Sequence, residues 1–456
     1  MIDLNLHAVA GILGVDDRGL ADIAFNGVTI DSRKACDGQL FVALDGDNFD
    51  GHDFVDAAYR NGAVAALVEK PVDSDIAQLQ VADSIQAMGQ LANYWRRYCD
   101  PRVIALTGSN GKTTVKEMLF QILTRQASTH ATRGNFNNDI GVPLTLFELD
   151  QDHEFAIVEM GANHRGEIGL LAEIAEPDIV YVNNVAAAHL AGFGDVQGVI
   201  EAKGELYAYC SPEQQALFNA DETASQYWHS LCAAQTQLTC ALEREADFGA
   251  DWQSLAGGIE VDFNYQGENH ACKLAVMGEH NARNALAAVG LAVLAGIEFS
   301  QAVANLEGFT GVKGRLQSMA GPAHSRMIND SYNANPDSLE AGIKVLCALE
   351  GSPWLALGDM GELGHEAAEF HRKAAQTARE HGVEKLFGVG EMSCLASTEF
   401  GEAGYCYECI EDMANGILAQ IHADVNLLIK GSRAAHMERL VEMLTRASSG
   451  GDVNAV

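Results

Sequence analysis

Apolar and polar positions follow two patterns along the chain, one typical of buried strands and one typical of amphipathic helices. In the middle of the sequence, the apolar run Val103–Leu106 predicts a buried strand that leads into a Gly-rich loop. One apolar helix face follows the loop at the spacing i, i+3, i+4, i+7 and i+8: Val115, Met118, Leu119, Ile122 and Leu123. Two further runs, Phe155–Val158 and Ile179–Val182, end in polar residues, as parallel strands do at the binding edge of a doubly wound sheet.

The two ends of the chain carry similar patterns. Toward the N-terminus, strand-like runs at 39–44 and 63–68 surround a helix-like segment at 54–61, which indicates a small α/β module. Toward the C-terminus, the patterns alternate in the order of a second doubly wound unit, with strands at 325–328, 354–357, 385–389 and 425–429 and helices at 337–349, 366–381 and 437–445.

The motif content changes twice along the chain, and no Pro-rich, Ser-rich or low-complexity linker marks these changes. Because 456 residues exceed one ordinary hydrophobic core, we expect three domains, at 1–82, 83–314 and 315–456. The predicted fold class is α/β. It comprises a small N-terminal α/β domain, a central doubly wound sheet of the phosphate-loop type, and a C-terminal Rossmann-like domain.

The charge balance excludes some classes of partner. The formal net charge is -34, whereas nucleic acids and anionic membranes are bound by basic surfaces. No apolar run approaches the roughly 20 residues that span a bilayer, and the N-terminus lacks a basic signal region. Ten cysteines are scattered along the chain without a histidine cluster at zinc spacing. We therefore expect a cytoplasmic protein with reduced thiols, no nucleic-acid partner and no stable membrane insertion.

The segment Thr107–Thr114 is the strongest candidate for chemistry. It offers consecutive backbone N–H groups, Lys112 and the Thr113 hydroxyl at a helix N-terminus, which suits a nucleoside triphosphate and Mg²⁺. It is shorter than a strict Walker A loop, which would place a Gly where Leu106 stands. Its position between strand and helix patterns favours phosphate binding over a plain turn.

Three other residues each have a functional and an ordinary interpretation. Glu159 follows an apolar strand, so it is a candidate Mg²⁺ ligand at the sheet edge or a solvated strand-end carboxylate. His189 alone is more often a surface or core histidine than a ligand. Lys203 alone is most simply a solvated lysine that pairs with Glu201 or Glu205.

Several loop and junction residues are equally open. Asn281 suits either a helix cap or an adenine contact, and Arg315 and Asp330 suit either a hinge surface or a nucleotide contact. The Asn-rich run 133–143 and the strand end 430–433 suit either anion or peptide recognition or ordinary loops.

Taken in order, the motifs resemble the Mur ligase family across essentially the whole chain. They are TGSNGKTT at 107–114, the Glu after its strand, AAAHL around His189, AKGE around Lys203, GEHNARNALAA from Gly278, and NDSYNANP at 329–336. Four further segments most resemble the dipeptide-adding branch of the family: DSRKACDGQLFVALDGDNFDGHDF, GNFNNDIGVP, MGANHRGEIG and KGSR. Tyr332 stands where several relatives are expected to carry a Lys, so no phosphate contact is expected from that side chain.

The resemblance implies an ATP-dependent amide-forming reaction in cell-wall precursor synthesis. ATP would phosphorylate the terminal carboxylate of a UDP-N-acetylmuramoyl-tripeptide, and the amine of D-alanyl-D-alanine would attack the acyl phosphate. A carboxylate is a poor electrophile until one oxygen is phosphorylated, and the charge of two anions must be neutralised while they react.

The resemblance also assigns roles to residues. It implies nucleotide contacts from Gly108, Ser109, Asn110, Gly111, Lys112, Thr113, Thr114, Asn281, Arg315 and Asp330. It implies substrate contacts from Ser32, Arg33, Asn135, Asn137, Asn138, Asp139, Lys430, Ser432 and Arg433. Two Mg²⁺ ions would be held by Thr113, Glu159, His189 and a carbamylated Lys203, and the catalytic residues would be Lys112, His189 and Lys203.

Because these residues are spread over three domains, we expect a monomer whose domains close around ATP and substrate. Two alternatives remain open at the level of sequence. One is a related amide ligase with a different acceptor amine, and the other is a nucleotide-dependent binding or switch protein that performs no ligation.

Overall fold

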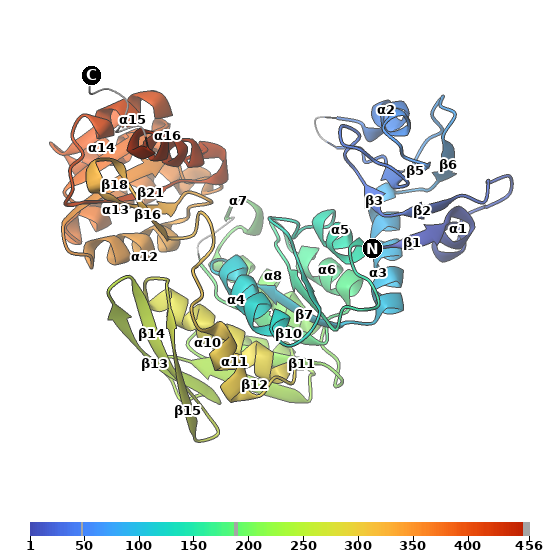
Figure 1. The fold of residues 1–456 in the computed structure, drawn as a ribbon, viewed down its shortest axis with the longest axis horizontal. Coiled ribbons are helices and arrows are strands. Elements are labelled where there is room, and N and C mark those ends of the chain that lie inside the picture. The colour runs from blue at the N-terminus through green and yellow to red at the C-terminus, as the bar shows by residue number, and fades with distance from the viewer. Residues whose placement is uncertain (47–48, 187–189, 450–456) are drawn as a thin grey trace.

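The computed structural model describes residues 1–46, 49–186 and 190–449 (Figure 1). The N-terminal part contains a parallel sheet in the order β3 (Val28–Thr29), β4 (Leu40–Val42), β5 (Ala65–Val68) and β6 (Ala77–Gln80). A short antiparallel pair, β1 (Asp3–Asn5) and β2 (Ala24–Asn26), flanks α1 (Leu6–Leu13), and α2 (Val55–Arg60) lies between β4 and β5 in sequence. The predicted small α/β module is therefore present.

The central sheet has nine strands in the order β15-β14-β13-β12-β11-β10-β7-β9-β8. Its parallel part comprises β7 (Arg102–Thr107), β8 (Thr129–Ala131), β9 (Phe155–Glu159), β10 (Ile179–Val182), β11 (Gln215–Asn219), β12 (Thr236–Ala241) and β13 (Phe248–Leu255). The strands β14 (Gly258–Tyr265) and β15 (Glu268–Leu274) extend it as an antiparallel meander.

Strand β7 shows why the central sheet is covered on both faces. Val103 and Ala105 point into the core formed with α3 (Ser84–Cys99), α5 (Gly141–Phe147), α6 (Glu167–Ala175) and α8 (Val196–Ala208). Ile104 and Leu106 point into the opposite core, with α4 (Lys112–Thr124), α10 (Glu279–Leu294) and α11 (Phe299–Leu306). Because successive side chains of a strand face opposite sides, an uninterrupted apolar run is what a doubly covered strand requires.

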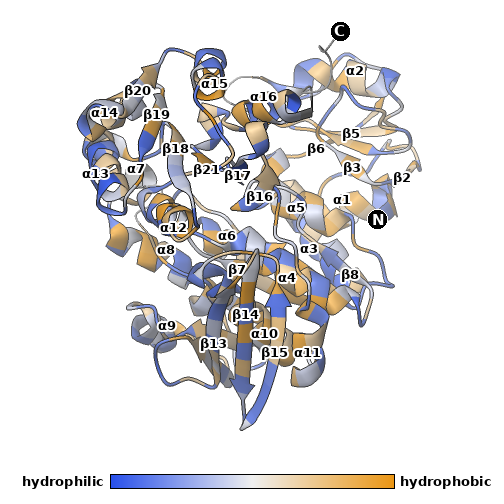
Figure 2. Cartoon of the chain, turned by 60° about the vertical axis from the view of Figure 1, so that its left-hand side comes forward, coloured by the Kyte–Doolittle hydropathy of each residue, from blue (hydrophilic) through white to orange (hydrophobic). Residues whose placement is uncertain are grey.

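The C-terminal sheet has six strands in the order β16-β17-β21-β18-β19-β20, and only β16 is antiparallel to its neighbour. The strands are β16 (Gln317–Ala320), β17 (Arg326–Asp330), β18 (Ser352–Gly358), β19 (Lys385–Val389), β20 (Gly404–Tyr407) and β21 (Val425–Lys430). One face packs on α12 (Pro336–Cys347), α13 (Ala367–Glu380) and α14 (Glu391–Phe400). The other packs on α15 (Ile410–Leu418) and α16 (Glu438–Ser449), and orange apolar positions follow these contact faces in Figure 2.

The α/β fold class predicted from the sequence is confirmed. The patterns missed the β13–β15 meander, although β14 alternates buried Ile259, Val261 and Phe263 with polar residues, which is the pattern of a strand with one covered face. The domain limits at 82/83 and 314/315 remain a prediction, and the N-terminal, central and C-terminal sheets lie within the corresponding ranges.

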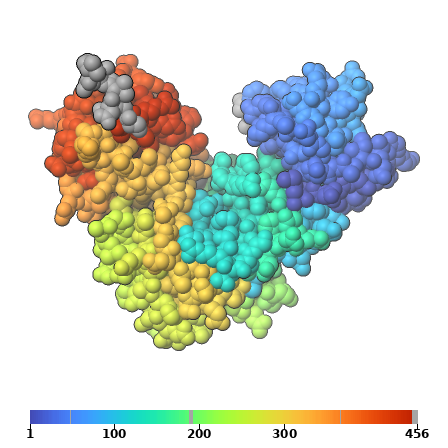
Figure 3. Space-filling view, viewed as in Figure 1, coloured from blue at the N-terminus to red at the C-terminus, as the bar shows by residue number. Residues whose placement is uncertain are grey.

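The molecule is hollowed between its two ends. Figure 3 shows the blue N-terminal part and the orange and red C-terminal part rising on either side of the central domain, with open space between them. Residues contributed by the two ends therefore reach one common site only if the ends move toward each other. Among the helices that the structure describes, none is long and apolar enough to cross a membrane.

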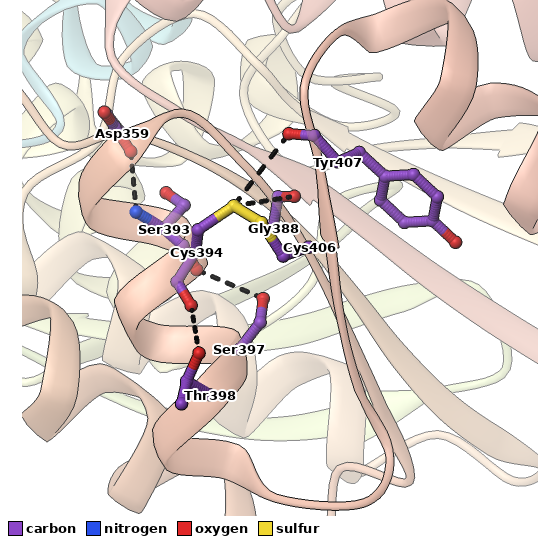
Figure 4. The surroundings of a disulfide bond; sticks show 8 residues. All are labelled: Asp359, Gly388, Ser393, Cys394, Ser397, Thr398, Cys406 and Tyr407. Carbon is purple, nitrogen blue, oxygen red and sulfur yellow. Dashed lines mark hydrogen bonds between the residues drawn. A yellow bond between two sulfur atoms is a disulfide. The ribbon is translucent and has the colours of Figure 1, made fainter.

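One expectation about the cysteines is wrong. Cys394 of α14 and Cys406 of β20 form a disulfide, with Cα atoms 4.9 Å apart (Figure 4). The other eight cysteines are free thiols, including Cys409, three residues after Cys406. The bond ties the third residue of β20 to the first turn of α14, where the Ser393 N–H also donates to Asp359 at 2.7 Å. The expectation of reduced thiols rested on scattered spacing, and spacing does not reveal that a helix and an edge strand bring two distant cysteines together.

Candidate active site

The phosphate loop joins the carboxyl end of β7 to the N-terminus of α4, as predicted. Gly111 precedes the first helical residue and has φ 78°, a left-handed conformation that favours glycine. A Cβ atom at Gly111 would lie 2.5 Å from Asn183 Nδ2 and 2.5 Å from Asn284 Oδ1. The loop therefore needs glycine here for both its backbone angle and its close contact with two amide side chains.

Two asparagines that the sequence analysis did not select hold this loop from below. The buried Asn183 side chain donates to the Asn110 carbonyl at 2.8 Å and to Asn284 Oδ1 at 3.0 Å. Asn184 accepts from the Asn110 N–H through its side chain at 2.8 Å and from the Ser109 N–H through its carbonyl at 3.0 Å. Both residues directly follow β10. Their position after a buried strand is the sequence feature from which their role could have been predicted.

Lys112 is folded back over the loop that it belongs to. Its Nζ donates to the carbonyl oxygens of Gly108 at 2.5 Å and Ser109 at 3.3 Å. Burial lowers the pKa of Lys112, while the nearby Glu159 carboxylate opposes that change. An ammonium held at this place is available to a phosphate that enters the loop.

Glu159 lies at the carboxyl end of β9 and is only 2 % exposed. Its Oε1 accepts from the Asn137 side chain at 3.0 Å, and its Oε2 has no hydrogen-bond partner among the described residues. A buried carboxylate oxygen without a donor is costly unless a cation compensates it. The solvated strand-end interpretation of Glu159 is therefore wrong, and the donor set suits a hard divalent cation.

The ordinary interpretation of Lys203 is also wrong. Lys203 lies on α8 at 2 % exposure, whereas its two proposed salt-bridge partners are engaged elsewhere. Glu201 pairs with Arg165 at 2.7 Å, and Glu205 accepts from the Gly166 N–H at 2.6 Å. Burial, followed by the nearby positive charge of Lys112, lowers the pKa of Lys203 to about 7. At neutral pH a large fraction of this side chain is an uncharged amine.

Metal ligation by protein side chains is sparse in this region. Within the part of the chain that the structure describes, no group of three or more His, Cys, Asp or Glu residues could hold a metal ion. His189, selected from the sequence as catalytic and metal-binding, lies outside the described residues. A cation next to Glu159 would therefore need oxygen atoms from neighbouring hydroxyl groups or from the phosphates themselves.

A cavity of about 930 Å³ collects most of the predicted site residues from the central and C-terminal domains. Those on its wall are Ser109, Asn110, Gly111, Lys112, Thr114, Asn135, Asn137, Asn138, Glu159, Lys203, Asn281, Arg315, Asp330, Lys430, Ser432 and Arg433. Gly108 and Thr113 belong to the same loop, and Asp139 follows Asn138, but none of these three lines the cavity.

Asn281 does not cap its helix, which removes one of its two interpretations. Gly278 is the N-cap of α10, and the Asn281 side chain instead donates to the Met277 carbonyl at 2.8 Å. It is almost fully buried and faces the cavity. Beside it, Arg283 forms ion pairs with Asp221 and, at 2.5 Å, with Glu243, so a charged rim that the sequence analysis missed borders this end of the cavity.

The far wall of the cavity comes from the C-terminal domain. Lys430 at the end of β21 forms a buried ion pair with Asp330 at the end of β17 and donates to the Asn333 carbonyl at 3.0 Å. Burial lowers the pKa of Lys430, and the Asp330 carboxylate opposes the shift. The guanidinium of Arg315 stacks over the Tyr332 ring at 4.1 Å, so Tyr332 supports an arginine where a lysine is expected in several relatives.

Ser32 and Arg33 lie apart from this cavity. They follow β3 in the N-terminal sheet, and the Arg33 side chain is 86 % exposed while its Nε donates to Asp31 at 2.8 Å. The Ser32 carbonyl accepts from the Asn61 side chain at 2.6 Å. Neither residue lines the cavity that contains the phosphate loop.

A strand, a shortened phosphate loop and a helix, with a carboxylate and a buried amine that line the same cavity, define a nucleotide-binding enzyme of the doubly wound α/β class. Three family models match the chain: Mur ligase family, catalytic domain, at residues 24–96; Mur ligase middle domain at 106–292; and Mur ligase, glutamate ligase domain, at 314–433. The chain is also 37 % identical to the UDP-N-acetylmuramoyl-tripeptide–D-alanyl-D-alanine ligase of Escherichia coli, over 97 % of this chain and 99 % of that protein. It belongs to the Mur ligase family.

Further relatives agree over nearly the whole length. The ligase of the same name from Bacillus subtilis is 32 % identical over 92 % of this chain and 93 % of its own. MurF from Acinetobacter baumannii superposes with a TM-score of 0.91 at 34 % identity, covering 98 % of this chain and 99 % of that chain. The MurF ligase from Thermotoga maritima in complex with ADP superposes with a TM-score of 0.82 at 26 % identity, covering 93 % and 98 %.

Proposed function

We propose that this chain uses ATP to join D-alanyl-D-alanine to a UDP-N-acetylmuramoyl-tripeptide in peptidoglycan precursor synthesis, with ADP and phosphate as the other products. The relatives that match nearly the full chain carry this activity in their names. The observation that carries the proposal is one cavity that joins a phosphate loop, a carboxylate with an unpartnered oxygen, and a buried amine.

The first half of the reaction makes the tripeptide carboxylate reactive. One of its oxygens attacks the γ-phosphorus of ATP, the bond to the β-phosphate oxygen breaks, and an acyl phosphate and ADP form. Lys112 moves from the Gly108 and Ser109 carbonyl oxygens to the β and γ phosphates, and loop N–H groups donate to the same oxygens.

The second half forms the amide. The amine of D-alanyl-D-alanine attacks the acyl carbon, the carbon–oxygen bond to phosphate breaks, and the amine loses its proton. Asn135, Asn137, Asn138 and Asp139 orient the tripeptide end, and Lys430, Ser432 and Arg433 hold the incoming dipeptide. Ser32 and Arg33 bind the UDP end, while Asn281, Arg315 and Asp330 contact adenine and ribose.

Two Mg²⁺ ions complete the proposed site. Thr113 and Glu159 would hold one, and His189 and Lys203 would support the other; the buried, unpartnered Oε2 of Glu159 fits such a cation. When bound, Mg²⁺ neutralises phosphate charge as the γ-phosphoryl group is transferred.

Lys203 is proposed to act as a carbamate. Its pKa of about 7 leaves much of the amine uncharged near neutrality, so the nitrogen can bond to the carbon of CO₂ and release a proton. The product is an anionic oxygen donor at a place where a free ammonium would repel a metal ion. Lys203→Ala should lower the ligation rate by roughly 100-fold, and small carboxylates should partly restore it; an unimpaired variant would contradict this role.

The enzyme is proposed to work in the cytoplasm as a monomer that closes its domains around ATP and the UDP-linked substrate. The decisive experiment measures phosphate release from ATP with the UDP-muramoyl tripeptide, with and without D-alanyl-D-alanine. Release that depends on this dipeptide is expected. Preference for another amine in an acceptor panel would make the chain a different Mur-type ligase, and ATP consumption without any acceptor dependence would favour a nucleotide switch.

A further inference from the structure

A second lysine of the phosphate-loop helix is buried away from the cavity. Lys116 lies one turn after Lys112 on α4 and is 1 % exposed. Its Nζ is 2.5 Å from the Thr132 carbonyl oxygen and 2.9 Å from Glu117 Oε1. Since Lys116 does not line the cavity, contact with the nucleotide does not explain its burial.

Thr132 connects Lys116 to the strand that carries Glu159. It directly follows β8, is 1 % exposed, and its hydroxyl accepts from the Glu159 N–H at 3.0 Å. Its own N–H donates to the Ile157 carbonyl at 3.0 Å. Thr132 therefore holds β9 at the last residue of the strand, and Lys116 holds Thr132.

Few other contacts orient the Glu159 carboxylate, which lies at the end of this series of contacts. Glu159 Oε1 accepts from Asn137, and Oε2 has no hydrogen-bond partner among the described residues. The direction of Oε2 thus depends on where the Glu159 backbone is fixed relative to α4. The same helix begins with Lys112 and Thr113, which follow the phosphate loop.

We infer that Lys116 is a positioning residue that sets the separation between the phosphate loop and the Glu159 carboxylate, so that both engage one Mg²⁺–nucleotide complex. The inference rests on the nucleotide and metal roles proposed above. An ammonium on a four-carbon chain spans the gap between α4 and β8 and donates to a carbonyl there, whereas an apolar side chain of similar volume would fill the space without fixing it.

A purely structural role makes a different prediction from a positioning role. If Lys116 only stabilises the fold, its replacement lowers the unfolding temperature and affects ADP binding equally with and without Mg²⁺. If it positions Glu159, its replacement selectively weakens the contribution of Mg²⁺ to ADP binding. Groups that orient metal ligands from behind typically change metal affinity by about 10- to 100-fold.

The test is isothermal titration of ADP into the full-length protein, in Mg²⁺ and in EDTA. We expect Lys116→Met to reduce the ratio of the two affinities by about tenfold, with ADP affinity in EDTA changed by less than about threefold. Lys116→Arg should retain most of the ratio because it keeps a buried donor. Lys344→Met is the matched control, since Lys344 is an exposed helical lysine paired with Glu340 at 2.8 Å.

Thr132 provides a second route if Lys116→Met does not fold. Thr132→Val removes the acceptor of the Glu159 N–H and should lower the same ratio, whereas Thr132→Ser should preserve it. Variants that fold and keep the wild-type ratio would overturn the inference, as would an equal loss of affinity in both buffers. A wild-type protein whose ADP affinity ignores Mg²⁺ would overturn the metal role of Glu159 as well, while the acceptor dependence of phosphate release tests the ligase proposal independently.

Discussion

The side-chain amide of Asn335, at the start of α12, donates to the side-chain oxygen of Asn110 in the phosphate loop at 2.8 Å. This hydrogen bond joins two residues 225 positions apart, one in the C-terminal domain and one in the central domain. Asn335 also caps α12, because its oxygen accepts from the Ser338 N–H at 2.9 Å while the Ser338 hydroxyl accepts from the Asn335 N–H. One side chain therefore fixes both a helix start and its contact with the loop.

Asn335→Asp separates these two roles. Aspartate is a good helix cap, so the free energy of unfolding should stay within about 0.5 kcal/mol of wild type. The variant lacks the donor to Asn110 and adds a negative charge beside the phosphates, so the KM for ATP should rise about tenfold. Asn335→Ala should in addition destabilise the protein by about 1 kcal/mol. Denaturant unfolding and steady-state kinetics check both, and an unchanged KM in Asn335→Asp would contradict the interdomain role.

Gly111→Ala should abolish nucleotide binding. The new Cβ atom would lie 2.5 Å from two amide atoms, of Asn183 and Asn284, in a backbone conformation that already disfavours alanine. Gly267→Ala in the β14–β15 turn is the control, since Gly267 has a similar φ of 84° and nothing within 4 Å of its added Cβ. ADP titration should show loss of binding only for Gly111→Ala. ADP binding that persists in Gly111→Ala would contradict the need for glycine at this position.

His130 should make the protein sensitive to acid. Burial, with the neighbouring His153 and Arg133 charges, lowers the pKa of His130 to about 4. The unfolded chain takes up this proton near pH 6.5, so stability is lost as the pH falls from about 6.5 toward 4, by roughly 3 kcal/mol from this group. Backbone hydrogen bonding with Thr145 and the Asp150 charge oppose the shift.

Unfolding in urea at pH 7.0 and pH 5.0 measures this effect. His130→Gln should lose less stability between the two pH values than wild type does. His381→Gln, at an exposed histidine directly after α13, is the control for replacing a histidine elsewhere in the chain. The same pH dependence in wild type and His130→Gln would exclude His130 as the source.

Domain closure should be visible in solution. The N-terminal residues Ser32 and Arg33 lie outside the cavity that holds most of the other predicted site residues, and the molecule is hollowed between its ends (Figure 3). Small-angle scattering should show a smaller radius of gyration when a non-hydrolysable ATP analogue and the UDP-linked tripeptide are both present. An identical scattering curve with and without these ligands would argue against closure.

The disulfide can be tested by counting free thiols. Thiol titration of the protein denatured without reductant should find eight free thiols, against ten in the sequence, and Cys406→Ser should give nine. Because the bond closes a loop of 12 residues, its loss should cost about 2 to 3 kcal/mol of stability. Ten free thiols in protein purified under air would contradict the bond.

The fold was predictable because its signals are local. Val103–Leu106, the glycines after it and the apolar face of α4 are contiguous, so strand, loop and helix follow from periodicity alone. The position of Glu159 at a sheet edge was predictable for the same reason. The β13–β15 meander, which extends the parallel part at its edge, was missed because no motif drew attention to it.

The supports of the site could not be found in this way. Two contacts arise where elements that are distant in sequence meet: the Asn110–Asn335 hydrogen bond and the packing of Asn183 under the loop. Neither residue type nor spacing predicts such contacts. The burial of Lys203 could not be predicted from its neighbours in the sequence. Glu201 and Glu205 are close to it along the chain, but in the structure they contact Arg165 and the Gly166 N–H, and the lysine is buried. Burial is a property of the whole chain, and it decides whether a lysine is ordinary or reactive.

The two hydrogen bonds that Lys112 makes within its own loop bear on how the side chain would receive ATP. The Gly108 and Ser109 carbonyl oxygens accept from this ammonium, as phosphate oxygens would. Binding of ATP would exchange these carbonyl acceptors for phosphate oxygens. The loop's own carbonyl oxygens therefore stand in for the phosphate oxygens as acceptors of the Lys112 ammonium.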